Sequence, residues 1–304
     1  LLNISTNSYL SRHLNHMYKA LVRSHVDYCD LIYHIPPTSH APPLGTTLHD
    51  HMERVEKIQY QAALAVTGAW QGTSRVKIYE ELGWESLSDR RMCKRVLQLH
   101  KIIDEKTPAY LREKLPAYRN VIINLPNVFR EIRCRTDRYQ NSFFPNAVSH
   151  WNNIISDFKD LPSFTELKKH VISLIRPSPK ETFNVFQPNL LRYLFQIRLG
   201  LSRLRRHKKS HNFADTPSDL CLCKTGIEDT RHYLLTCPFY ASHREVLVTS
   251  VENIIRGKNL EQSTISLDLF LYGDPSLSNS ENQCIISATL KFIENSNSPA
   301  GSMY

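Results

Sequence analysis

The stretch HKKSHNFADTPSDLCLCKTGIEDTRHYLLTC, residues 207–237, places three cysteines and a histidine in the order C-x-C-x8-H-x4-C. These residues are Cys221, Cys223, His232 and Cys237. Zinc prefers thiolate and imidazole ligands, and a closed set of four leaves no open position for catalysis. Cys221 and Cys223 can come from one tight turn. His232 is expected on a short helix that ends at Cys237, because Pro238 disfavours helical backbone in the residue before it. The spacing therefore predicts one structural zinc site.

Two other interpretations of this stretch remain open. His207 and His211 stand four residues apart, as two ligands on one helix face would, so a ligand set that uses one of them is possible. Alternatively, the cysteines are buried thiols and the histidine is solvated. Asp219 and Asp229 lie nearby but suit turn and helix-cap roles better than metal ligation.

The sequence before the cysteines is basic and lacks acidic residues from Thr182 to Ala214. We expect a helix from Leu190 to Arg206, with leucines and Ile197 on its apolar side and with Arg198, Arg205 and Lys209 on an exposed face. Such a face is either simply solvated or binds phosphate. The cations that we predict to contact nucleic acid here are Arg198, Arg203, Arg205, Arg206, Lys208 and Lys209.

Two further basic runs are candidates for the same role. The segment from Asp89 to Arg95 places four cations on about one and a half helical turns, and they are either solvated or bind phosphate. These cations are Arg90, Arg91, Lys94 and Arg95. The run from Arg130 to Arg138 contributes Arg133 and Arg135, and aromatic residues follow it. Aromatic rings beside arginines can stack on bases, but this density of rings also suits a core.

Composition bounds the function class. The 304 residues carry a net charge of +9, 41% hydrophobic residues and seven cysteines. Basic blocks favour a polyanionic partner, although a basic surface can also merely keep a chain soluble. An odd number of cysteines makes a poor disulfide framework and favours a reducing, intracellular compartment, the nucleus or cytoplasm. The sequence shows no signal peptide and no uninterrupted 18-residue apolar run, so no membrane partner is expected.

The chain is predicted to be mostly α. Apolar residues recur at helical spacing along it, and alternating β-branched runs are scarce. Ser163 and Glu166 form a capping-box pattern before one of these helices. Expected helices include those near 8–33, 48–69, 75–82, 87–104, 164–175, 190–206, 240–255 and 282–294.

Signatures of catalysis are missing from the sequence. It contains no Asp-Asp pair of the kind that polymerases use to hold two metal ions, no phosphate-binding loop, no H-E-x2-H and no G-x-S-x-G. Asp268, Asp274 and Glu281 lack the lysine of a nuclease-like pattern. We therefore expect no catalytic residue in this chain alone.

Six ordered stretches nevertheless resemble one protein family, over roughly residues 18–293. They are YKALVRSHVDYCD (Tyr18–Asp30), IQYQAALAVTGAWQGTS (Ile58–Ser74), YEELGWESLSDRR (Tyr79–Arg91), RYQNSFFPNAVSHWNNI (Arg138–Ile154), RLGLSRLRRHKKSHNFADT (Arg198–Thr216) and the cysteine-histidine stretch. Together they are similar to the C-terminal part of a jockey-like non-LTR retrotransposon reverse transcriptase, an RNA-directed DNA polymerase. In that family the fingers and the catalytic palm lie upstream.

The resemblance implies a helical thumb-like region (1–115), a connecting region (116–188), a basic helix with a zinc knuckle (189–240) and a helical tail (241–304). It also implies template RNA, target DNA and the upstream fingers and palm of the parent polyprotein as partners. Because the chain begins Leu1-Leu2 without methionine, a fragment of a longer protein is one interpretation. The alternatives are a helical protein-interaction module that binds an acidic partner, and a domesticated or pseudogene remnant with a structural zinc site.

Overall fold

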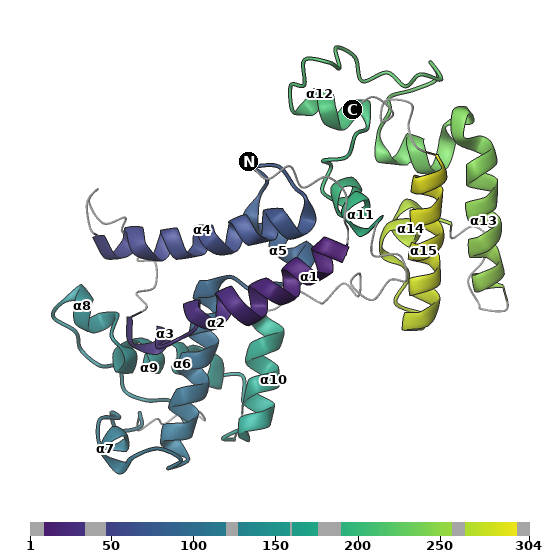
Figure 1. Ribbon diagram of the computed structural model, residues 1–304. Coiled ribbons are helices and arrows are strands. Elements are labelled where there is room, and N and C mark those ends of the chain that lie inside the picture. Colours follow the sequence, from purple (N-terminus) through teal and green to yellow (C-terminus); the bar gives the residue numbers. More distant parts are fainter. Residues whose placement is uncertain are drawn as a thin grey trace. The chain divides into compact units, whose positions relative to one another are not determined.

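The computed structural model describes residues 9–33, 47–119, 127–158, 160–175, 190–256 and 265–296. These residues are mostly helical, as the sequence predicts (Figure 1). Within these ranges, β-type pairing is limited to two isolated antiparallel bridges, Tyr118 with Phe129 and Leu220 with Ile227.

The helical segments are of the α, π and 3₁₀ types. In chain order they are α1 (Tyr9–Met17), the π-helical η1 (Tyr18–Val22), α2 (Arg23–Val26), α3 (Asp30–Tyr33), α4 (Thr47–Thr67), α5 (Arg75–Leu82), α6 (Leu87–Ile103), α7 (Ala109–Arg112), α8 (Asp137–Gln140), α9 (Phe143–Ile155), α10 (Phe164–Ile175), α11 (Leu191–Arg198), α12 (Arg205–Ser210), the π-helical η4 (His232–Thr236), the 3₁₀-helical η5 (Pro238–Tyr240), α13 (Ala241–Ile255), α14 (Leu267–Tyr272) and α15 (Asn279–Asn295).

Internal contacts divide the chain into two compact units, neither of which is continuous in sequence. The first unit comprises Leu1–Tyr18, Ala62–Leu82 and Pro179–Tyr304, and the second comprises Lys19–Gln61 and Gly83–Ser178. These units therefore do not coincide with four consecutive regions along the sequence.

The core of the second unit lies between α6, α9 and α10. Trp151 of α9 is fully buried among Val96 and Leu99 of α6 and Leu167 of α10. Its indole nitrogen donates to the carbonyl oxygen of Asn127 at 3.0 Å, so the ring's one polar atom is paired. The ring of Trp151 therefore belongs to the core, whereas Tyr139, in the same group of aromatic residues after the arginine run, is 49% exposed.

The start of α10 confirms the predicted capping box. The Glu166 carboxylate accepts the backbone N–H of Ser163 at 2.8 Å, and the Ser163 hydroxyl accepts the N–H of Glu166 at 3.3 Å. Two donors at the helix start are thus satisfied reciprocally. The signal needs only four consecutive residues, which makes it readable from sequence.

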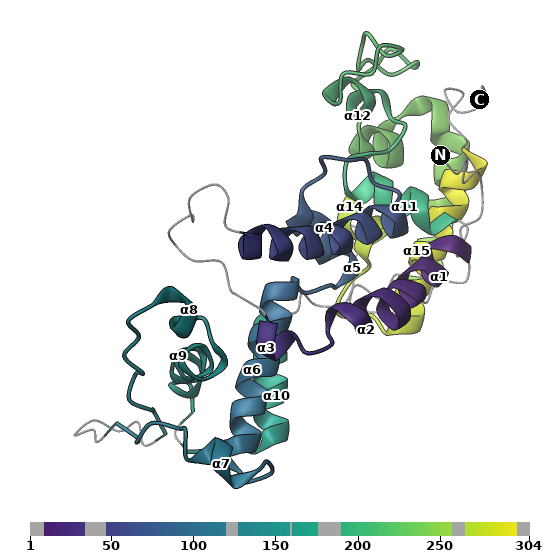
Figure 2. The same ribbon diagram turned by 60° about the vertical axis from the view of Figure 1, so that its left-hand side comes forward.

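The first unit packs α13 beside α15 (Figure 1), and α15 also contacts α11 and α14 (Figure 2). Val251 of α13, Phe270 of α14 and Leu290 of α15 are fully buried, and the Thr289 hydroxyl donates to the carbonyl oxygen of Phe270 at 3.0 Å. This helical end of the chain adjoins the cysteine-histidine stretch, because the Tyr233 and Ser296 hydroxyls contact each other at 2.5 Å.

The expected single helix from Leu190 to Arg206 is wrong, because the helix ends at Arg198 and a new one begins at Arg205. Gly200 adopts φ +70°, a left-handed conformation that favours glycine. The N–H of Leu201 donates to the carbonyl oxygen of Gln196 at 2.7 Å, and that of Gly200 to Ile197 at 3.2 Å. These two bonds are the Schellman pattern that ends many helices.

Candidate metal centre and basic surfaces

The four predicted metal ligands converge in the structure. The ligand atoms of Cys221, Cys223, His232 and Cys237 all lie within 4.8 Å of one another. The sulfurs of Cys221 and Cys237 are 3.6 Å apart, and the sulfur of Cys223 is 3.1 Å from Nε2 of His232. A tetrahedral ion with bonds of about 2.0–2.3 Å separates its ligands by about 3.5–3.8 Å. The cluster therefore has the size that one metal ion requires.

A tight turn presents the first two ligands. The N–H of Cys221 donates to the carbonyl oxygen of Gly226 at 2.9 Å, and the N–H of Lys224 donates to that of Cys221 at 2.9 Å. The bridge between Leu220 and Ile227 closes this turn. Cys221 and Cys223 thus point from one small loop, as their spacing predicts.

The other two ligands come from η4 and the residue after it. The N–H of Cys237 donates to the carbonyl oxygen of His232 at 2.7 Å, which makes the turn wider than an α-helical one. Cys237 then has an extended ψ of 120°, as expected before Pro238. Sequence spacing predicted a helix here but not its π-helical form.

Contacts around His232 fix its orientation. Its Nδ1 lies 3.1 Å from the Thr236 hydroxyl, so Nε2 faces the sulfur of Cys223. A partner on the second ring nitrogen commonly orients a metal-ligating histidine. The backbone N–H of His232 donates to Asp229 Oδ1 at 2.7 Å, which confirms the helix-cap role predicted for Asp229.

In the absence of a bound cation, the three cysteine thiols differ in pKa. Burial raises the pKa of Cys221 to about 12 and also raises that of Cys237. Burial would raise the pKa of Cys223 as well, but hydrogen bonds from Thr225, Cys221 and His232 lower it to about 6. Neighbouring thiolates repel one another, and a bound divalent cation reverses this preference by deprotonating its thiol ligands. This donor set therefore fits a soft divalent cation such as zinc.

Neither His207 nor His211 joins this cluster. Nδ1 of His207 lies 2.8 Å from the Ser202 hydroxyl, and burial lowers the pKa of His207 to about 4. The ring of His211 packs against Trp70 instead. The alternative ligand set is therefore not formed.

Two of the carboxylates weighed above as nuclease ligands have local structural roles instead. Glu281 caps the start of α15, and the Asp274 carboxylate accepts hydrogen bonds from Ser276.

Arg198 is not on the predicted exposed face. Its side chain is only 1% exposed and forms an ion pair with Glu81. It also donates from Nε to the carbonyl oxygen of Leu271 at 2.9 Å and lies over the ring of Tyr272. The surface position expected for Arg198 is therefore wrong, because burial and an acidic partner hold it inside the first unit.

The other cations near α12 have acidic neighbours from the cysteine-histidine stretch. Lys208 pairs with Asp215 at 2.9 Å, and Lys209 pairs with Asp219 at 3.0 Å. Arg205 lies 3.8 Å from Glu228 and donates to the carbonyl oxygen of Leu220 at 3.2 Å. The window that lacks acids in sequence is therefore partly neutralised in space. Arg203 and Arg206 are exposed.

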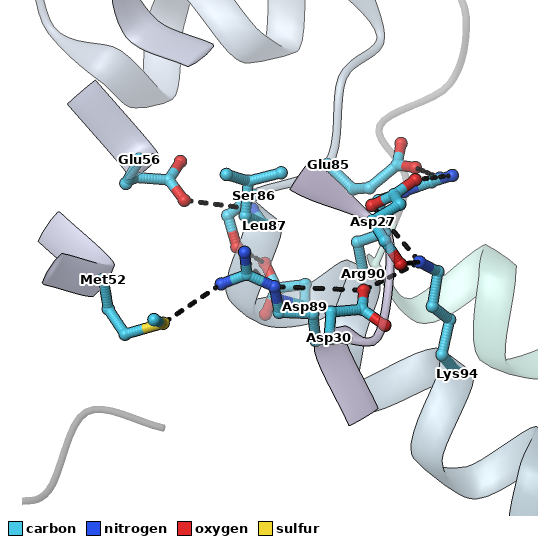
Figure 3. A network of polar contacts seen from close by, with 11 residues as sticks. Asp27, Asp30, Met52, Glu56, Glu85, Ser86, Leu87, Asp89, Arg90 and Lys94 are labelled. Carbon is cyan, nitrogen blue, oxygen red and sulfur yellow. Dashed lines mark hydrogen bonds and ion pairs between the residues drawn. The ribbon is translucent and has the colours of Figure 1, made fainter. Parts of the chain in front are cut away.

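In the run from Arg90 to Arg95, Arg90 and Lys94 belong to a network of ion pairs with acidic residues of the second unit rather than to an exposed basic face (Figure 3). Arg90 pairs with Asp27 at 2.8 Å and with Glu85 at 2.6 Å, and Lys94 pairs with Asp30 at 2.7 Å. Burial would raise the pKa of Asp27, but the hydrogen bonds and charges of Arg90 and Lys94 hold it below its usual value.

The remaining two cations of this run are buried. Arg91 is 2% exposed with its guanidinium 3.9 Å from Asp30, and Arg95 is 1% exposed and bonds to Asn146. Burial lowers the pKa of Arg95 to about 10. The interpretation of this run as a phosphate-binding face is therefore wrong, since its acidic partners come from residues near 27–30.

The run from Arg130 to Arg138, unlike the run from Arg90 to Arg95, lies at the surface. Arg133 and Arg135, together with Arg130 and Arg138, are all exposed. None of the four side chains forms an ion pair within the part of the chain that the structure describes. Within the described ranges, no acidic partner therefore offsets the charge of these four arginines.

Comparison with known proteins identifies no relative: no family model, no curated protein and no solved structure matches the chain. Across the described ranges, none of the helices combines the length and the apolar character needed to cross a membrane.

Proposed function

We propose that this chain is a nucleic-acid-binding segment of a retroelement RNA-directed DNA polymerase, without the polymerase's catalytic site. The observation that carries the proposal is the group of exposed arginines at 130, 133, 135 and 138, none of which forms an ion pair within the described residues. Arginine suits phosphate because its planar guanidinium donates several hydrogen bonds in a fixed geometry. The resemblance to a reverse transcriptase thumb and zinc knuckle supports the same reading.

The role of these arginines is to hold a phosphate backbone. Contacts to phosphate position a nucleic acid and carry no base sequence information. Binding should therefore depend strongly on salt concentration, because each neutralised phosphate releases counterions. Template RNA and target DNA are the ligands that the family resemblance suggests.

The second part of the proposal is one zinc ion, held by Cys221, Cys223, His232 and Cys237. A zinc ion bound by these residues would join the turn at 221–226 to η4 and Cys237 and would thereby stabilise this part of the fold. All four ligands come from the protein, and none is a carboxylate, which is typical of structural rather than catalytic zinc.

A salt titration in a filter-binding assay tests the proposal. The purified chain should retain labelled RNA and DNA at ~50 mM salt and release both as the salt concentration rises. Undetectable retention at ~50 mM salt would contradict it and would favour the alternative, a helical module that binds an acidic protein. The acid-free sequence window no longer separates these alternatives, because Asp215 and Asp219 pair with its lysines.

A further inference from the structure

Three aromatic rings from distant parts of the sequence meet at the surface of the first unit. Trp70 follows the end of α4, and His211 and Phe213 follow α12. The Trp70 ring lies 4.9 Å from that of His211, nearly perpendicular, and 4.8 Å from that of Phe213, centroid to centroid. Phe213 is 40% exposed, His211 is exposed and Trp70 is partly buried. The rings therefore present aromatic surface to solvent.

Both turns that carry these rings are held by hydrogen bonds. The Thr73 hydroxyl and N–H both donate to the carbonyl oxygen of Trp70, at 2.7 and 3.2 Å. On the other side, the N–H of Phe213 donates to the carbonyl oxygen of Lys208 at 3.1 Å, and Asn212 adopts φ +57°. The rings are thus pre-positioned, which reduces the entropy that a ligand would have to overcome.

Cations flank the rings. Arg192 is exposed, and its guanidinium packs against Gly68, two residues before Trp70: a Cβ on residue 68 would lie 1.9 Å from Arg192 Nε. Arg206 lies on α12, the helix directly before His211, and is also exposed. Neither arginine forms an ion pair within the described ranges. Exposed rings beside uncommitted cations are the combination that binds single strands, because bases stack on the rings while the cations contact phosphate.

We propose that Trp70, His211 and Phe213 form a stacking site for unpaired bases of single-stranded RNA or DNA, with Arg192 and Arg206 beside the backbone. This inference rests on the proposed function and adds the strandedness of the ligand. Bases in a duplex are already stacked on one another, so only an unpaired base can use the rings. The competing explanation is that the rings merely fix the loop after α12 to the end of α4.

Intrinsic fluorescence distinguishes the two explanations. The chain has three tryptophans, and Trp84 and Trp151 are only 1% and 0% exposed, so Trp70 alone is accessible to a ligand. When tryptophan is excited selectively, the emission of the unsubstituted chain should fall on addition of oligo(U) or oligo(dT). A duplex of equal length should reduce the emission much less. Comparing the affinities for oligo(U) and oligo(dT) shows whether the site prefers single-stranded RNA or single-stranded DNA.

A substitution then assigns the effect to the rings. Phe213→Leu keeps an apolar side chain but removes the stacking face, and it should weaken single-strand binding by roughly 5- to 100-fold while changing duplex binding little. Phe239→Leu is the matched control, because Phe239 is 54% exposed and its ring packs against that of Tyr240 rather than against Trp70 or His211. This control should bind like the unsubstituted chain.

Two results would overturn the inference. One is filter retention of oligo(U) and oligo(dT) without loss of tryptophan emission, which would leave the proposed function intact. The other is an equal effect of the Phe213 and Phe239 substitutions. Absence of any retention would remove the inference and the proposed function together. Should Phe213→Leu fail to fold, the quenching experiment still decides, since it needs no substitution.

Discussion

Glu81 and Arg198 form a buried ion pair although 117 positions separate them in the sequence. Their side chains are 3% and 1% exposed, so the pair is withdrawn from solvent. Arg198 also donates to the carbonyl oxygen of Leu271, at the end of α14. One guanidinium therefore connects α5, α11 and α14 within the first unit.

Replacing Arg198 with Gln should destabilise the protein by about 3–5 kcal/mol, because it leaves the Glu81 carboxylate buried without a counter-charge. The free energy of unfolding from urea denaturation is the measurement. Arg206→Gln, at an exposed position of the same stretch, is the matched control and should change stability by less than about 0.5 kcal/mol. Equal stability of the two variants would show that the pair is not buried as described.

The contrast between Arg198 and Cys223 shows which features can be predicted from sequence. All four metal ligands fall within 17 consecutive residues, so their spacing already reflects local geometry. The capping box at Ser163 is equally local, and Gly200 between two leucines was a readable helix end. By contrast, Glu81 lies 117 positions from its partner Arg198, and Asp27 lies 63 positions from its partner Arg90. No local pattern distinguishes a solvated arginine from one that the fold buries beside an acid.

Cys223→Ser should release the metal and unfold roughly residues 215–240, because in small knuckles the free energy of metal binding is also free energy of folding. Metal analysis should find one zinc per unsubstituted chain and none in the variant. Cys284→Ser provides the control, since Cys284 is an exposed thiol outside the cluster. Full zinc occupancy in the Cys223 variant would remove this ligand assignment.

Asp27→Asn should cost about 1–3 kcal/mol at neutral pH, because it removes the carboxylate that Arg90 and Lys94 share. The folded pKa of Asp27 is depressed, so its contribution is complete above its unfolded pKa of about 3.9 and is lost as the pH falls through the folded value. The stability difference between the two proteins should therefore be constant from about pH 7 to 5 and shrink below about pH 4. A difference that does not vary with pH down to denaturation would contradict the assignment.

Gly68→Ala should destabilise the end of α4 more than Gly72→Ala does. Both glycines have positive φ, +69° and +95°, so both substitutions incur a conformational cost of about 1 kcal/mol. Only at residue 68 would the added Cβ also meet a side chain, that of Arg192, whereas the space at residue 72 is open. Thermal unfolding of the two variants measures the difference. Equal losses would mean that Arg192 moves aside without cost.

The central claim is that arginines 130, 133, 135 and 138 hold a phosphate backbone. Its most direct test is the salt dependence of RNA and DNA affinity after all four are replaced with Gln. The control variant removes four exposed lysines elsewhere, at 57, 77, 168 and 169, and so has the same net charge.

For the arginine variant we predict weaker binding to every sequence and a slope of log K against log salt that is shallower by up to about three units for single strands and about 3.6 units for duplex DNA. The control should keep the original slope to within about one unit. An unchanged slope in a folded arginine variant would contradict the account.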